Sequence, residues 1–212
     1  GFDILGREGH LYPSIVGYAD NILVNGVIIG LIIIGGIGFL TWEDICEYKW
    51  KFKSYRMQSK LILATTVCLI IFPACFFFFA DFQHLPVKSR FLASVFQSVT
   101  PRTAGFNTVD ITMMTEASKV VMILLMLIGG SPGSTAGGMK TTTFAVLLLN
   151  AVATFKSQEH AGAFGRRIDD QVIKNAASIA MLYFMMFLAG GIVISTAEGL
   201  PILGSLFEAA SA

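Results

Sequence analysis

The sequence predicts an all-α integral membrane protein built from repeated units, each containing a membrane-spanning helix, a short re-entrant helix and a second spanning helix. Three observations support this fold class. Hydrophobic residues make up 54% of the chain and charged residues only 14%, whereas a soluble domain carries about 25% charged residues. Residues 61–80 contain no charge over a length that crosses a bilayer. The same order of long and short apolar segments occurs twice along the chain.

The first half of the chain contains three apolar segments. Residues 15–40 form a long apolar stretch that ends before Glu43, and a basic segment at 49–60 separates it from the uncharged span at 61–80. Residues 91–99 are moderately apolar but too short to cross a membrane. We therefore expect two spans followed by a short helix.

The second half repeats this order after a break. Residues 120–128 are apolar and run directly into a small-residue segment at 129–138, after which apolar character resumes over 142–155. Residues 176–196 form the last full span, and residues 201–212 begin another short helix. A glycine-rich break in an apolar segment predicts an unwound section of a membrane helix that lines a cavity.

The basic residues orient these segments. Segments 49–60 and 156–174 hold nine of the fifteen Lys and Arg residues, and short loops rich in Lys and Arg stay in the cytoplasm. The short helices at 91–99 and 201–212 then open from the outside and turn back, which makes them re-entrant. The pattern predicts a multi-pass protein of the plasma membrane.

An internal repeat relates the two short helices. Residues 94–100 align with residues 206–211 when Phe96 is placed on Phe207. The start of the chain resembles the end of the pentapeptide at 103–107 through its residues Gly1, Phe2 and Asp3. The period of roughly 105–110 residues fits one unit of span, re-entrant helix and span.

The pentapeptide after the first short helix is a candidate cation-binding loop. Potassium loses its water only where a set of oxygens replaces it, and backbone carbonyls do so when an extended segment points them inward. Gly105 permits backbone conformations that other residues resist, and the C-terminal end of the preceding helix is electronegative. The alternative is a simple turn between membrane helices. The candidate residues are Thr103, Ala104, Gly105, Phe106 and Asn107, with K⁺ at the carbonyls of Thr103, Ala104 and Gly105.

The small-residue segment is a candidate gate, because glycines absorb the backbone change of a segment that obstructs a pore and swings aside. It resembles a phosphate-binding loop only superficially, since Met139 occupies the lysine position. The alternative is a helix-packing site, which fits residues 35–38 better. Lys140 is either functional within the membrane or extends to the interface. The gate residues are Gly129, Gly130, Ser131, Pro132, Gly133, Ser134, Thr135, Ala136, Gly137 and Gly138.

Other chemistries have little support in the residues. The three cysteines and three histidines are isolated, so metal, disulfide and catalytic sites are not expected, and no basic patch indicates nucleic acid. Three functions remain open: a passive gated cation pathway, a coupled secondary transporter with a broken-helix site, and a structural membrane subunit. The long spans almost lack the carboxylates and histidines of a coupled carrier, which favours the first. No cofactor is expected. The residues concerned are Cys46, Cys68, Cys75, His10, His84 and His160.

Two long motifs and one short motif resemble the Trk/Ktr/HKT superfamily of potassium transporters. Residues 98–108 are similar to the third pore loop and filter of that family, residues 129–141 to its intramembrane gating loop, and residues 33–39 to the second helix of its second repeat. Short connections make the chain more similar to the Ktr-type membrane subunit. The resemblance covers nearly the whole chain.

The resemblance implies four repeats around one central pore. Residues 1–56 would contain the end of the second filter and the second helix of repeat 2. Residues 57–158 would form a complete repeat 3, and residues 159–212 the first helix and pore helix of repeat 4. The chain would thus begin within the second filter and stop before the fourth. The resemblance also implies a homodimer in membrane lipid, a cytosolic nucleotide-binding regulatory subunit and, in some members, Na⁺ as an activator.

Overall fold

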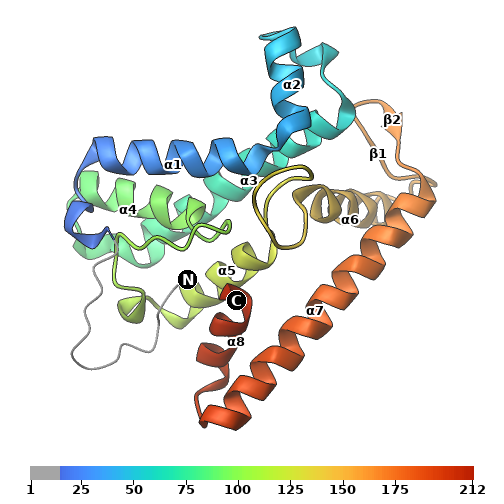
Figure 1. Ribbon diagram of the computed structural model, residues 1–212. Coiled ribbons are helices and arrows are strands. Elements are labelled where there is room, and N and C mark those ends of the chain that lie inside the picture. The colour runs from blue at the N-terminus through green and yellow to red at the C-terminus, as the bar shows by residue number, and fades with distance from the viewer. Residues whose placement is uncertain (1–14) are drawn as a thin grey trace.

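A computed structural model describes residues 15–212 of the chain (Figure 1), and the predicted filter residues Gly1, Phe2 and Asp3 lie outside this range. Helices account for nearly all regular structure in the described residues, so the all-α prediction is confirmed. The α-helices are α1 (Ile22–Ile37), α2 (Phe39–Tyr48), α3 (Met57–Ala80), α4 (Val87–Val99), α5 (Glu116–Leu127), α6 (Thr141–Phe155), α7 (Asp170–Glu198) and α8 (Ile202–Ser211). Short 3₁₀ turns lie at Val16–Tyr18, Phe52–Ser54, Phe82–His84 and Ile111–Met113.

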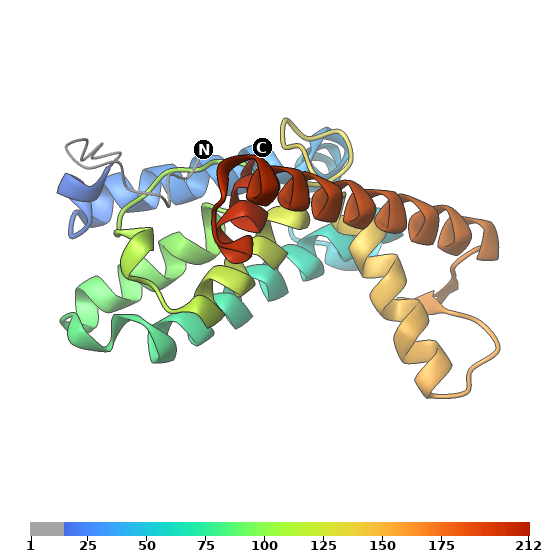
Figure 2. The same ribbon diagram turned by 90° about the horizontal axis from the view of Figure 1, so that it is seen from below.

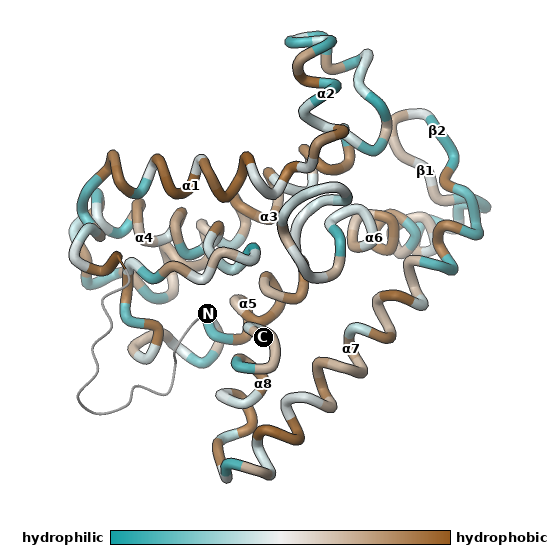
Figure 3. The backbone as a smooth tube through the Cα atoms, in the orientation of Figure 1, coloured by the Kyte–Doolittle hydropathy of each residue, from teal (hydrophilic) through white to brown (hydrophobic). Residues whose placement is uncertain are grey.

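Two helices are long and apolar enough to cross a membrane, namely α3 and α7. Helices α1 and α2 together provide a third candidate span, but a bend of 98° separates them. Hydrophobic residues lie along the outer surfaces of α1 and α7 (Figure 3). Since the medium around a spanning helix is hydrocarbon, such outward apolar faces indicate that the protein lies in a membrane.

The apolar stretch at 15–40, expected as a span, is divided by a bend in the structure. Helix α1 ends at Ile37, and Gly38 has φ 88° and ψ 149°, which no helix accommodates. Helix α2 then starts in a new direction and extends beyond Glu43 to Tyr48. Composition alone does not reveal this bend, because the segments on both sides of it remain apolar.

The internal repeat appears as two helical hairpins, in which α4 packs against α3 and α8 packs against α7. The aligned residues Phe96 and Phe207 are both fully buried. Ser94 and Ser205, which lie two positions before them, each donate a hydroxyl hydrogen bond to the backbone carbonyl four residues earlier. The two short helices therefore share burial and local hydrogen bonding as well as sequence.

The main hydrophobic core lies where α3, α4, α5 and α8 meet. Phe77 of α3, Met122 of α5 and Phe207 of α8 are fully buried there. Helix α7 lies at the edge of the molecule in Figure 1 and crosses in front of the other helices in Figure 2. The second hairpin contacts α5 through α8 and α6 through α7, and both α5 and α6 contact α3 of the first hairpin.

A small hairpin connects α6 to α7 in the basic segment, and the sequence analysis did not anticipate it. Strands β1 (Gly162–Ala163) and β2 (Arg166–Arg167) pair antiparallel. The turn between them contains Phe164 and Gly165, both with positive φ. The ring of Phe164 lies edge-on to that of Phe52, which joins the two basic segments on one face.

Candidate functional site

The candidate filter loop is closed onto the end of α4 by Thr100. The Thr100 carbonyl accepts hydrogen bonds from the backbone N–H groups of Ala104, at 3.2 Å, and Gly105, at 3.1 Å. The Thr100 hydroxyl donates to the Phe106 carbonyl at 2.7 Å. Thr100 is fully buried. One threonine therefore fixes both ends of the loop.

The loop differs from the expected extended segment, because residues 101–104 form a turn. Thr103 has φ 61° and Gly105 has φ 75°. The left-handed region costs glycine little, whereas a β-branched residue adopts it only under constraint. The hydrogen bonds to Thr100 supply that constraint.

This turn directs carbonyl groups away from α4. The N–H groups of Ala104 and Gly105 point toward Thr100, and in a planar trans peptide the preceding carbonyl points the opposite way. The carbonyls of Thr103 and Ala104 consequently face away from Thr100. Within residues 15–212, the carbonyls of residues 103–105 accept no hydrogen bond from another residue.

A buried arginine lies next to the loop. Arg102 is 5% exposed, and its Nη2 group donates to the Thr66 hydroxyl of α3 at 3.3 Å. Within the described residues, its Nε and Nη1 atoms have no partner. Arg102 thus connects the turn to α3 through the Thr66 hydroxyl.

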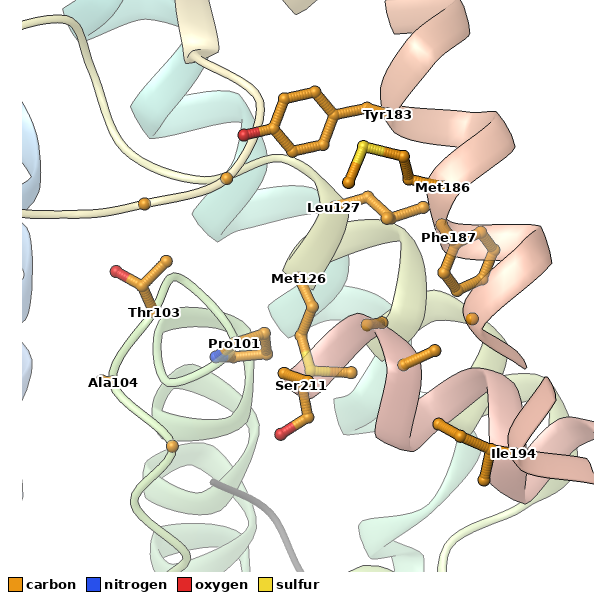
Figure 4. A pocket seen from close by; sticks show the side chains of 17 residues that line it. Pro101, Thr103, Ala104, Met126, Leu127, Tyr183, Met186, Phe187, Ile194 and Ser211 are labelled. Atoms are coloured by element: carbon orange, nitrogen blue, oxygen red, sulfur yellow. The ribbon is translucent and has the colours of Figure 1, made fainter. Parts of the chain in front are cut away.

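A cavity of about 810 Å³ adjoins these carbonyls. Its walls come from the filter loop, the end of α5, the small-residue segment, α7 and the end of α8, and Figure 4 shows their side chains around it. The lining residues are Pro101, Thr103, Ala104, Gly105, Met126, Leu127, Gly137, Gly138, Tyr183, Met186, Phe187, Gly190, Ile194, Ala209, Ala210, Ser211 and Ala212.

The loop that follows α4 and residues 209–212 of α8 both line this cavity. The C-terminal end of a helix carries about half a negative charge from its unpaired carbonyls. The end of α4, together with mostly apolar walls, favours a cation over an anion.

The candidate gate spans the break between α5 and α6. The Ile128 and Met139 backbones pair as a parallel bridge, the Gly129 N–H donates to the Met139 carbonyl at 2.9 Å, and the Gly130 N–H donates to the Gly137 carbonyl at 3.2 Å. The start and the end of the loop are thus held together. Many backbone N–H and carbonyl groups of the loop are hydrogen-bonded within the loop, as a non-helical segment at membrane depth requires.

The glycines of this loop permit close approach. A Cβ atom at Gly129 would lie 1.8 Å from the Gly137 carbonyl oxygen, and one at Gly130 would lie 2.3 Å from the Ala136 Cβ. Lys140 is turned back into the loop, where its Nζ atom donates to the Ala136 carbonyl at 2.8 Å. The glycines therefore permit one compact arrangement of the loop. They allow close backbone contacts here, in addition to the flexibility expected from the sequence.

The structure brings residues of the predicted filter and gate to the wall of one cavity, since residues 103–105 and 137–138 both line it. Phe106 and Asn107 lie on the far side of the loop, and their carbonyls accept hydrogen bonds from the Thr100 hydroxyl and the Ile15 N–H. The roles of all these residues stay predictions.

Sequence reasoning missed the face of α7 that lines the cavity. Tyr183, Phe187, Gly190 and Ile194 recur at helical spacing along one side of this span. That spacing was visible in the sequence, but an apolar stripe on a spanning helix is equally typical of a lipid-facing surface. The packing of α8 against α7 shows that this stripe faces the cavity and not the lipid.

The described residues thus form a helical membrane protein in which a short helix packs back against each of the two long spans. The chain belongs to the TrkH family of cation transport proteins, whose model matches residues 2–212. Its fold resembles the crystal structure of the potassium transporter TrkH from Vibrio parahaemolyticus, with a TM-score of 0.75 and 20% identity over 92% of this chain and 43% of that one.

Similar sequences come from other bacteria. The potassium/sodium uptake protein NtpJ of Enterococcus hirae is 35% identical over 206 residues, which are 95% of this chain and 44% of NtpJ. The Ktr system potassium uptake protein B of Bacillus subtilis is 34% identical over 209 residues, 95% of this chain and 47% of that protein. The chain spans less than half the length of these relatives.

Proposed function

We propose that the chain is part of the membrane pore subunit of a potassium uptake transporter and that its cavity is a section of the ion path. One observation carries the proposal: the filter loop that follows α4, whose carbonyls at residues 103–105 accept no hydrogen bond from residues 15–212, lines one cavity together with a glycine-rich loop. Oxygen dipoles without an acidic side chain suit a weakly hydrated monovalent cation.

In this proposal, the backbone carbonyls of Thr103, Ala104 and Gly105 replace part of the water around K⁺. The support is the direction of the Thr103 and Ala104 carbonyls away from Thr100 and the position of all three residues on the cavity wall. Gly1, Phe2 and Asp3 would contribute to a second filter segment. Since a ring of oxygens is needed, these segments act together with further repeats of the full-length protein.

Residues 129–138 are proposed to close the path below the filter, with Lys140 holding the loop compact. Support comes from Gly137 and Gly138, which line the cavity together with the filter loop. A loop whose two ends are fastened together can move as one unit. Its displacement would open the cavity toward the basic face of the protein, where the cytoplasm lies.

The equivalent hairpins support the proposed division into repeats, with residues 57–158 as repeat 3 and parts of repeats 2 and 4 on either side. Homodimer formation, control by a cytosolic nucleotide-binding subunit and activation by Na⁺ are proposed from the family resemblance. The names of the Ktr and sodium-linked relatives agree with these proposals.

Gly105→Ser tests the filter in the full-length protein, expressed in a bacterium that lacks its own potassium uptake. Serine at φ 75° strains the loop, so preference for K⁺ over Na⁺ should fall. Gly199→Ser is the matched control, because Gly199 has φ 66° at the end of α7 and lies away from the cavity. Equal ion preference in the two variants would contradict the filter assignment.

A deletion of residues 133–136 tests the gate in the same assay. The expected result is a higher basal potassium flux, since the loop no longer reaches across the path. The Gly129–Met139 hydrogen bond lies outside the deleted segment, which leaves the ends of α5 and α6 joined. Unchanged flux from a folded deletion variant would show that the loop only packs.

A further inference from the structure

The bend between α1 and α2 meets the gate loop through backbone hydrogen bonds. Helix ends leave carbonyl and N–H groups without a partner in the helix. Here the Ser131 N–H donates to the Gly36 carbonyl at 3.0 Å, and the Phe39 N–H donates to the Gly133 carbonyl at 3.1 Å. The gate loop thus satisfies both sides of the break, the end of α1 and the start of α2.

The fit at the bend is close. A Cβ atom at Gly38 would lie 2.5 Å from the Pro132 carbonyl oxygen, and one at Gly35 would lie 3.3 Å from the Thr135 hydroxyl oxygen. Gly26 and Gly30 on the same helix have no atom within 4 Å of such a Cβ. The need for small residues is therefore confined to the bend, where the partner is the loop and not another helix.

Helix α2 is held firmly on the far side of the bend. The Asp44 side chain is fully buried, and its Oδ2 atom accepts a hydrogen bond from the Arg56 N–H, at the start of α3, at 3.0 Å. The Arg56 side chain pairs with Glu43 at 2.9 Å. Across the bend, the Trp42 indole donates to the Ile34 carbonyl at 3.0 Å. These contacts couple α2 to the start of α3 and, across the bend, to α1.

We propose that residues 35–39, which we call the elbow, are the seat that holds the gate loop in its closed position. This inference rests on the proposed gating function of the loop. The Phe39–Gly133 and Ser131–Gly36 hydrogen bonds must break when the loop leaves the elbow. Helix α2 begins at Phe39, so a movement of α2 at the cytoplasmic face would break these hydrogen bonds. Such a movement of α2 would release the gate loop from the elbow.

A reversible cross-link tests the seat in the full-length protein. Gly35→Cys with Thr135→Cys, in a background with the native cysteines replaced by serine, places a Cβ atom about 3.3 Å from the position of the opposing sulfur, which suits a disulfide. Oxidation should form the bond and lower potassium flux several-fold, and a reductant should restore the flux. Gly30→Cys with Thr135→Cys is the control, and oxidant should leave its flux unchanged. The native cysteines are Cys46, Cys68 and Cys75.

The outcomes separate this inference from the gate itself. If the disulfide forms and flux stays the same while the 133–136 deletion raises flux, the loop gates but the elbow does not hold it. If the disulfide does not form under oxidation, the contact is absent in the membrane and the inference fails. If the deletion leaves flux unchanged, the gating proposal fails first. A reversible loss of flux in the Gly35–Thr135 pair alone supports the seat.

A second substitution tests, without a cross-link, whether contact with the elbow keeps the gate loop closed. Gly38→Ala should raise basal potassium flux, because the added methyl meets the Pro132 carbonyl oxygen and pushes the loop off the elbow. Gly30→Ala, on the open face of α1, should leave flux at the level of the unmodified protein. Equal flux in the two variants, with both proteins inserted at normal levels, would argue against the seat.

Discussion

Replacing Thr100 with valine should weaken ion discrimination while leaving the helices intact. Valine keeps the shape of threonine but lacks the hydroxyl that donates to the Phe106 carbonyl at 2.7 Å. The two hydrogen bonds to the Thr100 carbonyl involve only the backbone and remain. The substitution therefore releases the Phe106 end of the filter loop and keeps the Ala104 end fixed.

The magnitude follows from the loss of one part-buried hydrogen bond, since Phe106 itself is exposed. The net contribution of such a bond is about 0.5–1.5 kcal/mol. If the whole cost falls on the ordered form of the loop, the ratio of K⁺ to Na⁺ uptake should drop by roughly 2- to 12-fold, at about 1.4 kcal/mol per factor of ten.

The assay compares K⁺ and Na⁺ uptake by cells that express the full-length protein. Thr100→Ser retains the hydroxyl and should keep the ion preference. Ser94→Ala removes a hydroxyl from the same helix, but one that donates only to the Arg90 carbonyl of its own helix, and should also keep it. If Thr100→Val discriminates as well as Thr100→Ser, the hydroxyl does not order the filter loop and the reasoning is refuted.

Two further substitutions test the supports of the site. Asp44→Ala should lower the thermal unfolding temperature of the purified protein, because it removes the buried side-chain acceptor of the Arg56 N–H at the start of α3. Glu43→Gln, which removes only an exposed ion pair, should leave it unchanged. Gly191→Val should separate α8 from α7 and lower stability, since even a Cβ atom there lies 2.5 Å from a leucine of α8. Gly190→Ala should be tolerated, because its Cβ makes an ordinary contact at 3.6 Å, and equal stability of these two variants would contradict the packing.

The number and order of apolar segments could be predicted because segment length and charge follow directly from the membrane. The span at 61–80 lies within α3, and the span at 176–196 lies within α7. The helix at 91–99 in fact begins at Val87, since Lys88 and Arg90 obscure its first turn in the sequence. Such boundary errors arise because helix ends depend on caps as well as on hydropathy.

The elbow could not be predicted, because its cause lies far away in the chain. Residues 35–38 were interpreted as a helix-packing motif, and their small size is indeed used for close contact. The partner is a non-helical loop about 100 residues later, and nothing local in the sequence indicates it. The break at Gly38 is set by tertiary hydrogen bonds, which override the helical preference of the apolar residues on either side.

The residues of the candidate site could be predicted from the sequence, but the hydrogen bonds that hold the filter loop could not. Gly105 and the loop that contains it stood out by composition, while Thr100 did not, since a threonine at the end of a short helix is unremarkable in sequence. Its hydroxyl and its carbonyl act together only after the chain turns back at residues 101–104. The aligned Ser211 also carries a hydroxyl, which makes this position a feature of the repeat.

Backbone pairing explains why the break at Gly38 lies against the candidate gate loop. In a bilayer each unpaired carbonyl or N–H costs several kcal/mol, so a broken helix is stable only where another segment or water satisfies it. The break at Gly38 is satisfied by the gate loop, and the gate loop is satisfied partly by itself. In the proposed opening, the Gly36 carbonyl and the Phe39 N–H would lose their partners together. Water would have to take their place, so the proposal couples opening of the loop to wetting of the path below the filter.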